Sequence, residues 1–114
     1  VMASYRTRKP MENNENVYVQ LDICNENELC MFMANCDVVI NCAGASFING
    51  EKIARTAAKM KIPLVDPSGE SFLEERIKDI QKDNDFVLSS GCFPGMTGVL
   101  LNFLCSQFDD VKSL

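Results

Sequence analysis

Short apolar runs alternate with amphipathic stretches along the chain. The clearest run lies in residues 37–41 (DVVIN), where three consecutive β-branched residues leave no polar face. Such a run predicts a central strand of a parallel sheet, covered by helices on both faces. The small residues Cys42, Ala43 and Gly44 follow directly, so a ligand can approach the backbone closely there. Open α/β sheets bind their ligands at this carboxyl edge of the strands.

The same reading predicts the other elements. Further strands are expected at 1–5, 17–21, 62–65 and 86–88, and another begins at 111–114. Helical spacing of apolar residues covers 29–36, 53–60, 73–80 and 96–108, and the last of these helices is expected to be largely buried. Asn25 and Glu28 form a capping-box pattern, and Asn49 is expected to cap the second helix. This alternation predicts βαβ units and a parallel sheet in one domain, or part of one, over residues 1–114.

Composition narrows the classes of function. Of the 114 residues, 46% are hydrophobic and 24% are charged, which excludes wholesale disorder. The net charge of −5 argues against broad nucleic-acid binding, because a phosphate backbone requires a positive surface. The chain has no apolar run near the ~20 residues that cross a bilayer and no visible signal peptide. We therefore expect no membrane partner and a cytoplasmic location.

The six cysteines and the absence of histidine limit the chemistry further. No C-x-x-C pair occurs, so a zinc site is disfavoured and the expected metal is none. We expect reduced, mostly buried thiols. Ser-His-Asp and Cys-His machinery within this chain is excluded, because both need an imidazole.

A basic cluster follows the first predicted strand. Arg6, Arg8 and Lys9 come after Tyr5, and no acidic residue precedes them. In dinucleotide-binding folds an acid at this place binds the ribose 2′-hydroxyl, whereas arginine accommodates a 2′-phosphate. The cluster therefore favours NADP(H) over NAD(H). The alternative is a solvated basic loop.

Three other segments lie where strands end. Asp22 and Ile23 could face adenine, or Asp22 could simply form a turn. Residues 42–44 would run beside the ribose and pyrophosphate, unless their small size serves helix–sheet packing alone. In residues 66–70 (DPSGE), Asp66 could bind cofactor or substrate groups while Ser68 caps the next helix. No catalytic residue can be assigned, and Cys92 in the loop 91–95 is a weak nucleophile candidate without an identifiable base.

With these residues in place, the chain resembles the NAD(P)-binding domain of saccharopine dehydrogenase-like oxidoreductases. The resemblance covers nearly the whole chain. Four landmarks carry it, in the expected order: the basic run after Tyr5, then residues 37–44 (DVVINCAG), 65–70 (VDPSGE) and 91–95 (GCFPG). It implies a nicotinamide cofactor that reduces or oxidises a C=N, C=C or similar bond of a small-molecule substrate.

Two departures accompany this resemblance. Ala45 and Ser46 stand where the family often has proline, and no G-x-G-x-x-G turn occurs in the sequence. We therefore expect an incomplete, doubly wound Rossmann-like sheet that lacks its first βα unit, and no substrate domain. The strands at 1–5 and 37–41 would then have open edges, which predicts dimerisation, strand exchange or direct re-pairing of the two strands.

The alternative function is a non-catalytic Rossmann-like interaction scaffold, which the missing glycine-rich turn favours. A flavodoxin-like or receiver-type domain is disfavoured, since its phosphate loop or acidic cluster at the first strand is not seen. An antiparallel pairing of residues 38–40, or an outer position of that strand in contact with water, would remove the basis of the oxidoreductase assignment.

Overall fold

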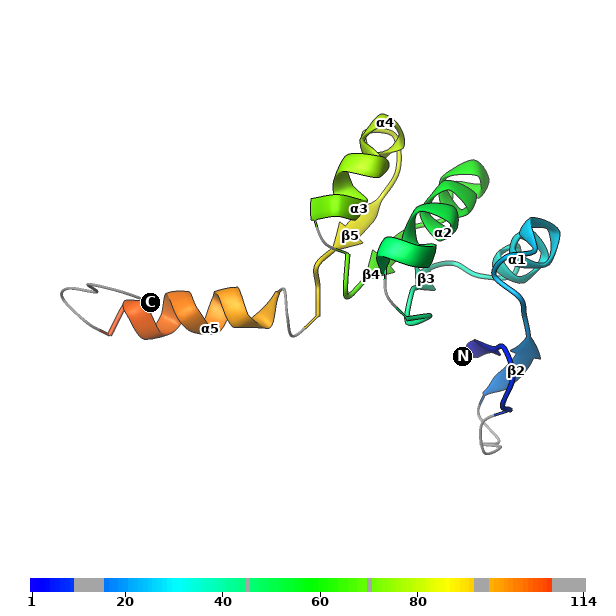
Figure 1. Cartoon of the computed structure of the whole chain (residues 1–114), viewed down its shortest axis with the longest axis horizontal. Coiled ribbons are helices and arrows are strands. Elements are labelled where there is room, and N and C mark those ends of the chain that lie inside the picture. The colour runs from blue at the N-terminus through cyan, green and yellow to red at the C-terminus, as the bar shows by residue number, and fades with distance from the viewer. Residues whose placement is uncertain (10–15, 45, 70, 92–94, 108–114) are drawn as a thin grey trace.

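The computed structural model describes residues 1–9, 16–44, 46–69, 71–91 and 95–107, and strands and helices alternate along it as predicted (Figure 1). The strands are β1 (Met2–Tyr5), β2 (Val17–Gln20), β3 (Val39–Ile40), β4 (Leu64–Asp66) and β5 (Phe86–Leu88). The helices are α1 (Glu26–Met33), α2 (Ser46–Met60), α3 (Ser71–Arg76), α4 (Lys78–Gln81) and α5 (Met96–Cys105). The strand expected at 111–114 lies outside the described residues.

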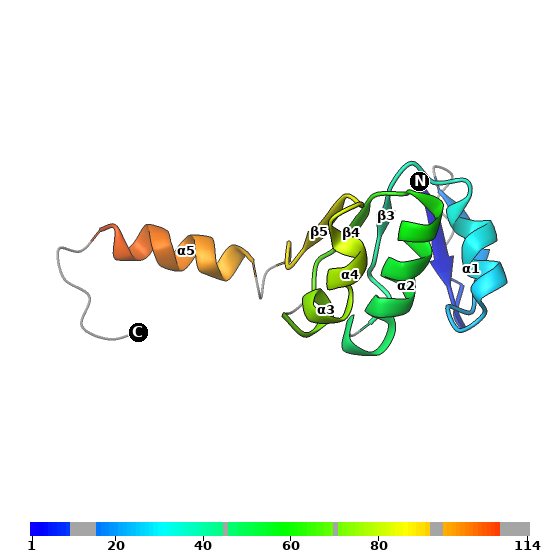
Figure 2. The ribbon, with the colours of Figure 1, turned by 90° about the horizontal axis from the view of Figure 1, so that it is seen from above.

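All strand pairing is parallel, as predicted. β1 pairs with β2, and a separate sheet has the order β3-β4-β5. In both views the strands follow one another as β2, β1, β3, β4 and β5, and Figure 2 shows them running in one direction. Their carboxyl ends therefore lie along a common edge. The protein is an α/β structure with two small parallel sheets.

The environment expected for β3 is wrong in two respects. β3 is an outer strand of its sheet rather than a central one, and helices cover only one of its faces (Figure 1). Val39 is buried in the core, while Val38 and Ile40 on the opposite face are exposed. A continuous β-branched run fits either a strand covered twice or a strand with one face open, so the sequence pattern could not separate the two. Among the described residues β1 does not re-pair with β3, which excludes direct re-pairing within this chain.

The core lies between the three-stranded sheet and its helices. Its residues are aliphatic side chains and alanines from the predicted stripes: Leu21, Leu29, Met33, Val39, Ile53, Ala54, Ala57, Leu64, Leu73 and Ile77. The buried α2 alanines Ala54, Ala57 and Ala58 let this helix lie close to the sheet. Gly50 on the same helix is buried. A Cβ there would meet the Leu73 side chain at 2.9 Å, so glycine permits this close packing.

Helix boundaries differ from the prediction at three places. Asn25 caps α1 as expected, but the Glu28 carboxylate returns to the backbone N–H of Asp22 rather than that of Asn25. α2 begins at Ser46, so Asn49 lies inside its first turn and is not its cap. The helix expected over 73–80 is divided into α3 and α4 at Ile77, whose backbone (φ −109°, ψ 8°) leaves the helical region.

α5 contradicts the expectation of a buried helix, because none of its residues is buried. It extends away from the rest of the protein along the longest axis (Figures 1 and 2).

The cysteines also differ from expectation. Of the five in the described part of the chain, Cys24 and Cys42 are exposed and the other three are half-buried. No helix within the described ranges is both long enough and apolar enough to span a membrane.

Candidate functional site

A fully buried carboxylate organises the carboxyl edge of the three-stranded sheet. Asp66, the last residue of β4, accepts a hydrogen bond from Asn41 Nδ2 (2.7 Å to Oδ2) and another from Ser46 Oγ (2.7 Å to Oδ1). Its Oδ1 also accepts the backbone N–H of Ser68 at 3.0 Å. We call Asn41, Ser46, Asp66 and Ser68 the Asp66 cluster. It ties β3, the start of α2 and the loop after β4 to one side chain, as a buried charged group requires.

The loop after β3 is held by the same cluster. Asn41 Oδ1 accepts the backbone N–H of Ala43 at 3.1 Å, and Asn49 Nδ2 donates to the Ala43 carbonyl at 3.2 Å. Both polar ends of the Asn41 amide are thus used, one toward Asp66 and one toward the loop. This arrangement leaves Cys42 and Gly44 exposed.

Gly44 discriminates between the two interpretations of the small residues after β3, contact with a ligand and helix–sheet packing. Its φ is +86°, a conformation that favours glycine, and a Cβ built there would meet nothing within 4 Å. Tight helix–sheet packing therefore does not explain the glycine. The loop has open space beside it, as backbone contact with a ligand requires.

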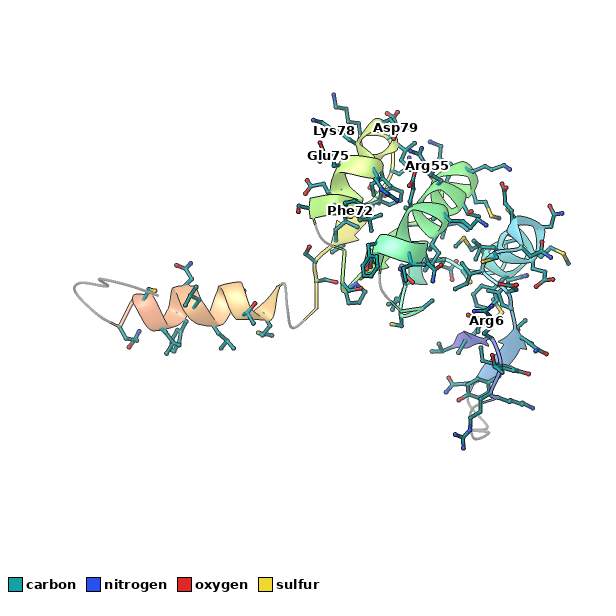
Figure 3. The ribbon with its side chains drawn as sticks, viewed as in Figure 1. Arg6, Arg55, Phe72, Glu75, Lys78 and Asp79 are labelled. Atoms are coloured by element: carbon teal, nitrogen blue, oxygen red, sulfur yellow. The ribbon has the colours of Figure 1, made fainter. Side chains whose placement is uncertain are left out.

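The basic residues lie at the end of the neighbouring sheet. Arg6 and Arg8 follow β1 and are exposed, and the Arg6 carbonyl accepts Gln20 Nε2 at 3.1 Å, which fixes the start of this loop. Figure 3 shows Arg6 beside β1, well away from Arg55 and Asp79 on the helical side. Two guanidinium groups in solvent at a strand end suit a doubly charged phosphate.

Asp22 and Ile23 follow β2 and serve the local structure. Asp22 Oδ1 accepts the backbone N–H of Cys24 at 3.0 Å, which is the turn-forming role considered from the sequence. The Asp22 side chain is nevertheless exposed. Ile23 is half-buried and packs against the core.

The predicted residues therefore form two groups, one at each sheet. Arg6, Arg8, Asp22 and Ile23 belong to β1–β2, whereas residues 42–44 and Asp66 belong to β3–β4. Two lysines of α2 contact the segment that follows β2. Lys52 Nζ donates to the Cys24 carbonyl at 2.8 Å, and Lys59 Nζ lies 3.2 Å from Glu26 Oε1.

The residues that follow β5 contact the loop after β4 at the same edge of the sheet. Ser89 has φ +54° and donates through Oγ to the Gly69 carbonyl, and the Gly91 N–H donates to the Pro67 carbonyl at 2.9 Å. Ser68 is not the N-cap of α3, since that helix begins at Ser71. Cys92, the weak nucleophile candidate, lies outside the described residues.

The half-buried Cys36 thiol is not activated as a nucleophile. Burial, and after it the neighbouring Asp37 carboxylate, raises the pKa of the Cys36 thiol above its ordinary value. Its Sγ lies 3.5 Å from the Phe32 carbonyl, to which it donates. Cys36 therefore stays protonated at neutral pH and belongs to the core rather than to the site.

Sequence reasoning missed the positioning residues of the site. The sequence pattern places Asn41 within a strand, gives Ser46 no role and predicts Asn49 as a helix cap. The available signal was that Asn41 and Asp66 are the first polar residues after neighbouring apolar strands. Only the strand pairing brings them within hydrogen-bond distance.

Comparison with known proteins identifies no relative: no family model matches the chain, and no curated protein matches it in sequence.

Proposed function

We propose that this chain is the NADP(H)-binding portion of an oxidoreductase with a doubly wound, Rossmann-like sheet. The observation that carries the proposal is the order of the strands. The chain proceeds from β1 to β2 in one direction and from β3 through β4 to β5 in the other. Ligands of open α/β sheets bind where the order reverses, outside the carboxyl ends of the strands. Here that place lies between the ends of β1 and β3.

The residues on the two sides of this place suit a phosphorylated dinucleotide. Arg6 and Arg8 would hold the 2′-phosphate, and Asp22 and Ile23 would face the adenine. Residues 42–44 would run along the ribose and pyrophosphate, where the space beside Gly44 is open.

Asp66 acts indirectly in this proposal. Its carboxylate is buried and bound to Asn41, Ser46 and Ser68, so it holds the loop after β3 in place rather than touching a ligand.

When bound, the nicotinamide supplies or accepts a hydride. The resemblance to the saccharopine dehydrogenase-like class makes a small molecule with a C=N or C=C bond the expected substrate class.

β3 is an outer strand and its Val38 and Ile40 side chains are exposed, which is the outcome that removes the sequence-based reason for an oxidoreductase and leaves the proposal to rest on the strand order. The same outer position favours a second candidate, a non-catalytic interaction scaffold. Among the described residues β3 has an unpaired edge and an exposed face, so one side of the proposed crevice is open to solvent. A scaffold requires no dinucleotide, so binding discriminates between the two functions.

The test is a titration of the isotope-labelled protein with NADPH and NADH, followed by amide NMR spectra. We expect weak binding, because no G-x-G-x-x-G turn is present to hold the pyrophosphate. NADPH should shift the signals of residues 5–9 and 42–44. Replacing Arg6 and Arg8 together with alanine should weaken NADPH binding by about tenfold or more and leave NADH binding nearly unchanged.

Arg76→Ala is the matched control, since it removes a guanidinium group from α3, away from the strand ends. It should leave both affinities unchanged. Equal binding of the two dinucleotides would contradict the assignment of the 2′-phosphate to Arg6 and Arg8. If neither NADPH nor NADH binds at the highest concentration used, the result favours the scaffold.

A further inference from the structure

The outer face of the three-stranded sheet is apolar, and none of the described helices covers it. Ile40 pairs in register with Val65, and Val65 with Val87, so these side chains form a continuous row across β3, β4 and β5. Ile40 is 61% exposed and Val87 is 53% exposed. Val38, which directly precedes β3, is 49% exposed as well. We call Val38, Ile40, Val65 and Val87 the bare face; Figure 1 shows α2, α3 and α4 all on the other side.

Helix α5 carries an apolar stripe that has no partner either. Met96, Val99, Leu100, Phe103 and Leu104 follow helical spacing on one side, and Gly98, Leu101, Asn102 and Cys105 lie on the other. Val99 is 66% exposed and Phe103 is 61% exposed. Residues 96–107 contain no charged side chain, and the bare face contains none. The two surfaces therefore match in polarity.

The width of α5 also matches that of the bare face. A ten-residue helix is about 15 Å long and, with its side chains, about 10 Å wide. Three strands spaced about 4.8 Å apart present a face about 10 Å across. The bare face thus has room for one helix.

The turn before α5 directs this helix away from its own sheet. The Gly91 N–H is held by the Pro67 carbonyl, and the Met96 N–H donates back to the Gly91 carbonyl at 2.9 Å. Gly95 has φ +124°, and a Cβ there would collide with the carbonyl oxygens of Gly91 and Ser89. With this turn formed, α5 leaves the end of β5 along the long axis (Figure 2). In this position none of its residues is buried against the bare face of its own chain.

From these observations we infer that α5 of one copy covers the bare face of a second copy, and that the contact is reciprocal. The resulting two-fold dimer buries both apolar surfaces twice and leaves the turn at Gly91–Gly95 intact. The inference does not depend on dinucleotide binding. It differs from pairing through the open edges of β1 and β3, because it uses side chains of the sheet face rather than backbone groups.

The test measures the mass of the full chain by analytical ultracentrifugation and native mass spectrometry. We expect a dimer for the wild type. Phe103→Asp on α5 and Ile40→Asp on the bare face should each weaken dimerisation by about 100-fold or more, since each places a charge in both copies of the contact. Mixing the two variants should yield a heterodimer, because the intact α5 of one meets the intact face of the other.

Met31→Asp is the matched control: Met31 is an exposed apolar residue of α1, and its replacement should leave the dimer intact. Circular dichroism checks that the variants are folded, and Phe103→Asp should not unfold the body because α5 buries no residue. Four results would overturn the inference: a monomer of any shape, an assembly larger than two copies, a dimer that survives both charged variants, or the absence of a heterodimer in the mixture. A compact monomer would place α5 on its own sheet, and a resistant dimer would indicate edge pairing.

Discussion

At the residue scale, Asp66 is the side chain on which the order of the carboxyl edge depends. It is completely buried, and its partners come from β3, α2 and the loop that follows β4. The Ser46 hydroxyl is part of this arrangement, so the side chain at the start of α2 has a structural role.

Removal of this carboxylate should destabilise the protein. We expect Asp66→Ala to lower the free energy of unfolding by about 2–4 kcal/mol, because it leaves the buried Asn41 amide and Ser46 hydroxyl without their acceptor. Urea denaturation measures the change. Asp83→Ala, at an exposed aspartate after α4, should change stability by less than about 0.5 kcal/mol. Similar losses in the two variants would show that the Asp66 cluster contributes nothing specific.

At the element scale, one arginine joins three helices on the covered side of the sheet. Arg55 of α2 lies 3.0 Å from Glu51 and 2.9 Å from Asp79 of α4, and it also donates to the Arg76 carbonyl at 2.8 Å. Arg76 in turn contacts Glu51 at 3.3 Å and lies over the Phe72 ring, 4.1 Å from its centroid. Figure 3 shows Arg55 and Asp79 facing each other across the α2–α4 boundary. This contact holds α4 in place after the break at Ile77.

The ion pair gives stability a dependence on acid pH. The hydrogen bond from Arg55 holds the pKa of the Asp79 carboxyl below its ordinary value. The lowered folded-state pKa means that the contribution is complete above the ordinary aspartate pKa and is lost as the pH falls through the lowered value.

We therefore expect Asp79→Asn to be slightly less stable than the wild type at neutral pH and equally stable in strong acid. The pair is exposed, so the difference at neutral pH should be small. Chemical denaturation at a series of pH values gives both curves. Glu75→Gln, at an exposed position of α3, should keep the wild-type pH dependence. A wild-type curve parallel to that of Asp79→Asn down to acid pH would contradict the role of the pair.

At the scale of the whole molecule, the protein is elongated because α5 stands apart from the body. Its radius of gyration is 17.0 Å, whereas a compact chain of about 100 residues has about 13 Å. Its extents are 54 × 37 × 23 Å. The excess length lies in α5 (Figures 1 and 2).

The separation of α5 predicts its behaviour in dilute solution. A ten-residue helix without packing is marginal in water, so its amide hydrogens should exchange with protection of no more than about tenfold, while those of α2 are strongly protected. Hydrogen–deuterium exchange followed by mass spectrometry compares the two helices in one sample. Raising the protein concentration should increase the protection of α5 alone. Strong protection of α5 at the lowest concentration would mean that it packs within its own chain.

Local patterns predicted the elements well, and the relations between elements poorly. Short apolar runs located β3, β4 and β5, and alternation located β2, because side-chain patterns are a property of neighbouring residues. The position of β3 at an outer edge could not be predicted, since it depends on which strands pair. The exposure of α5 was missed for the same reason: an apolar helix signals that it needs a partner but does not say where the partner lies.

The candidate site divides in the same way. The strand ends and their small or basic residues were visible in the sequence, because turn residues follow apolar runs directly. The hydrogen bond between Asn41 and Asp66 joins residues 25 positions apart, and only the β3–β4 register creates it. Roles that depend on such distant pairing, including those of Ser46 and Asn49, could not be read from local pattern.

The shortness of the open strands affects how the protein behaves when it is crowded. An exposed strand is a template on which further chains can stack, and segments of about six residues are needed to form the dry zippers of amyloid fibrils. β3 has two residues in strand conformation and β1 has four. Within the described residues, the open edges of β1 and β3 are therefore too short to seed fibril growth.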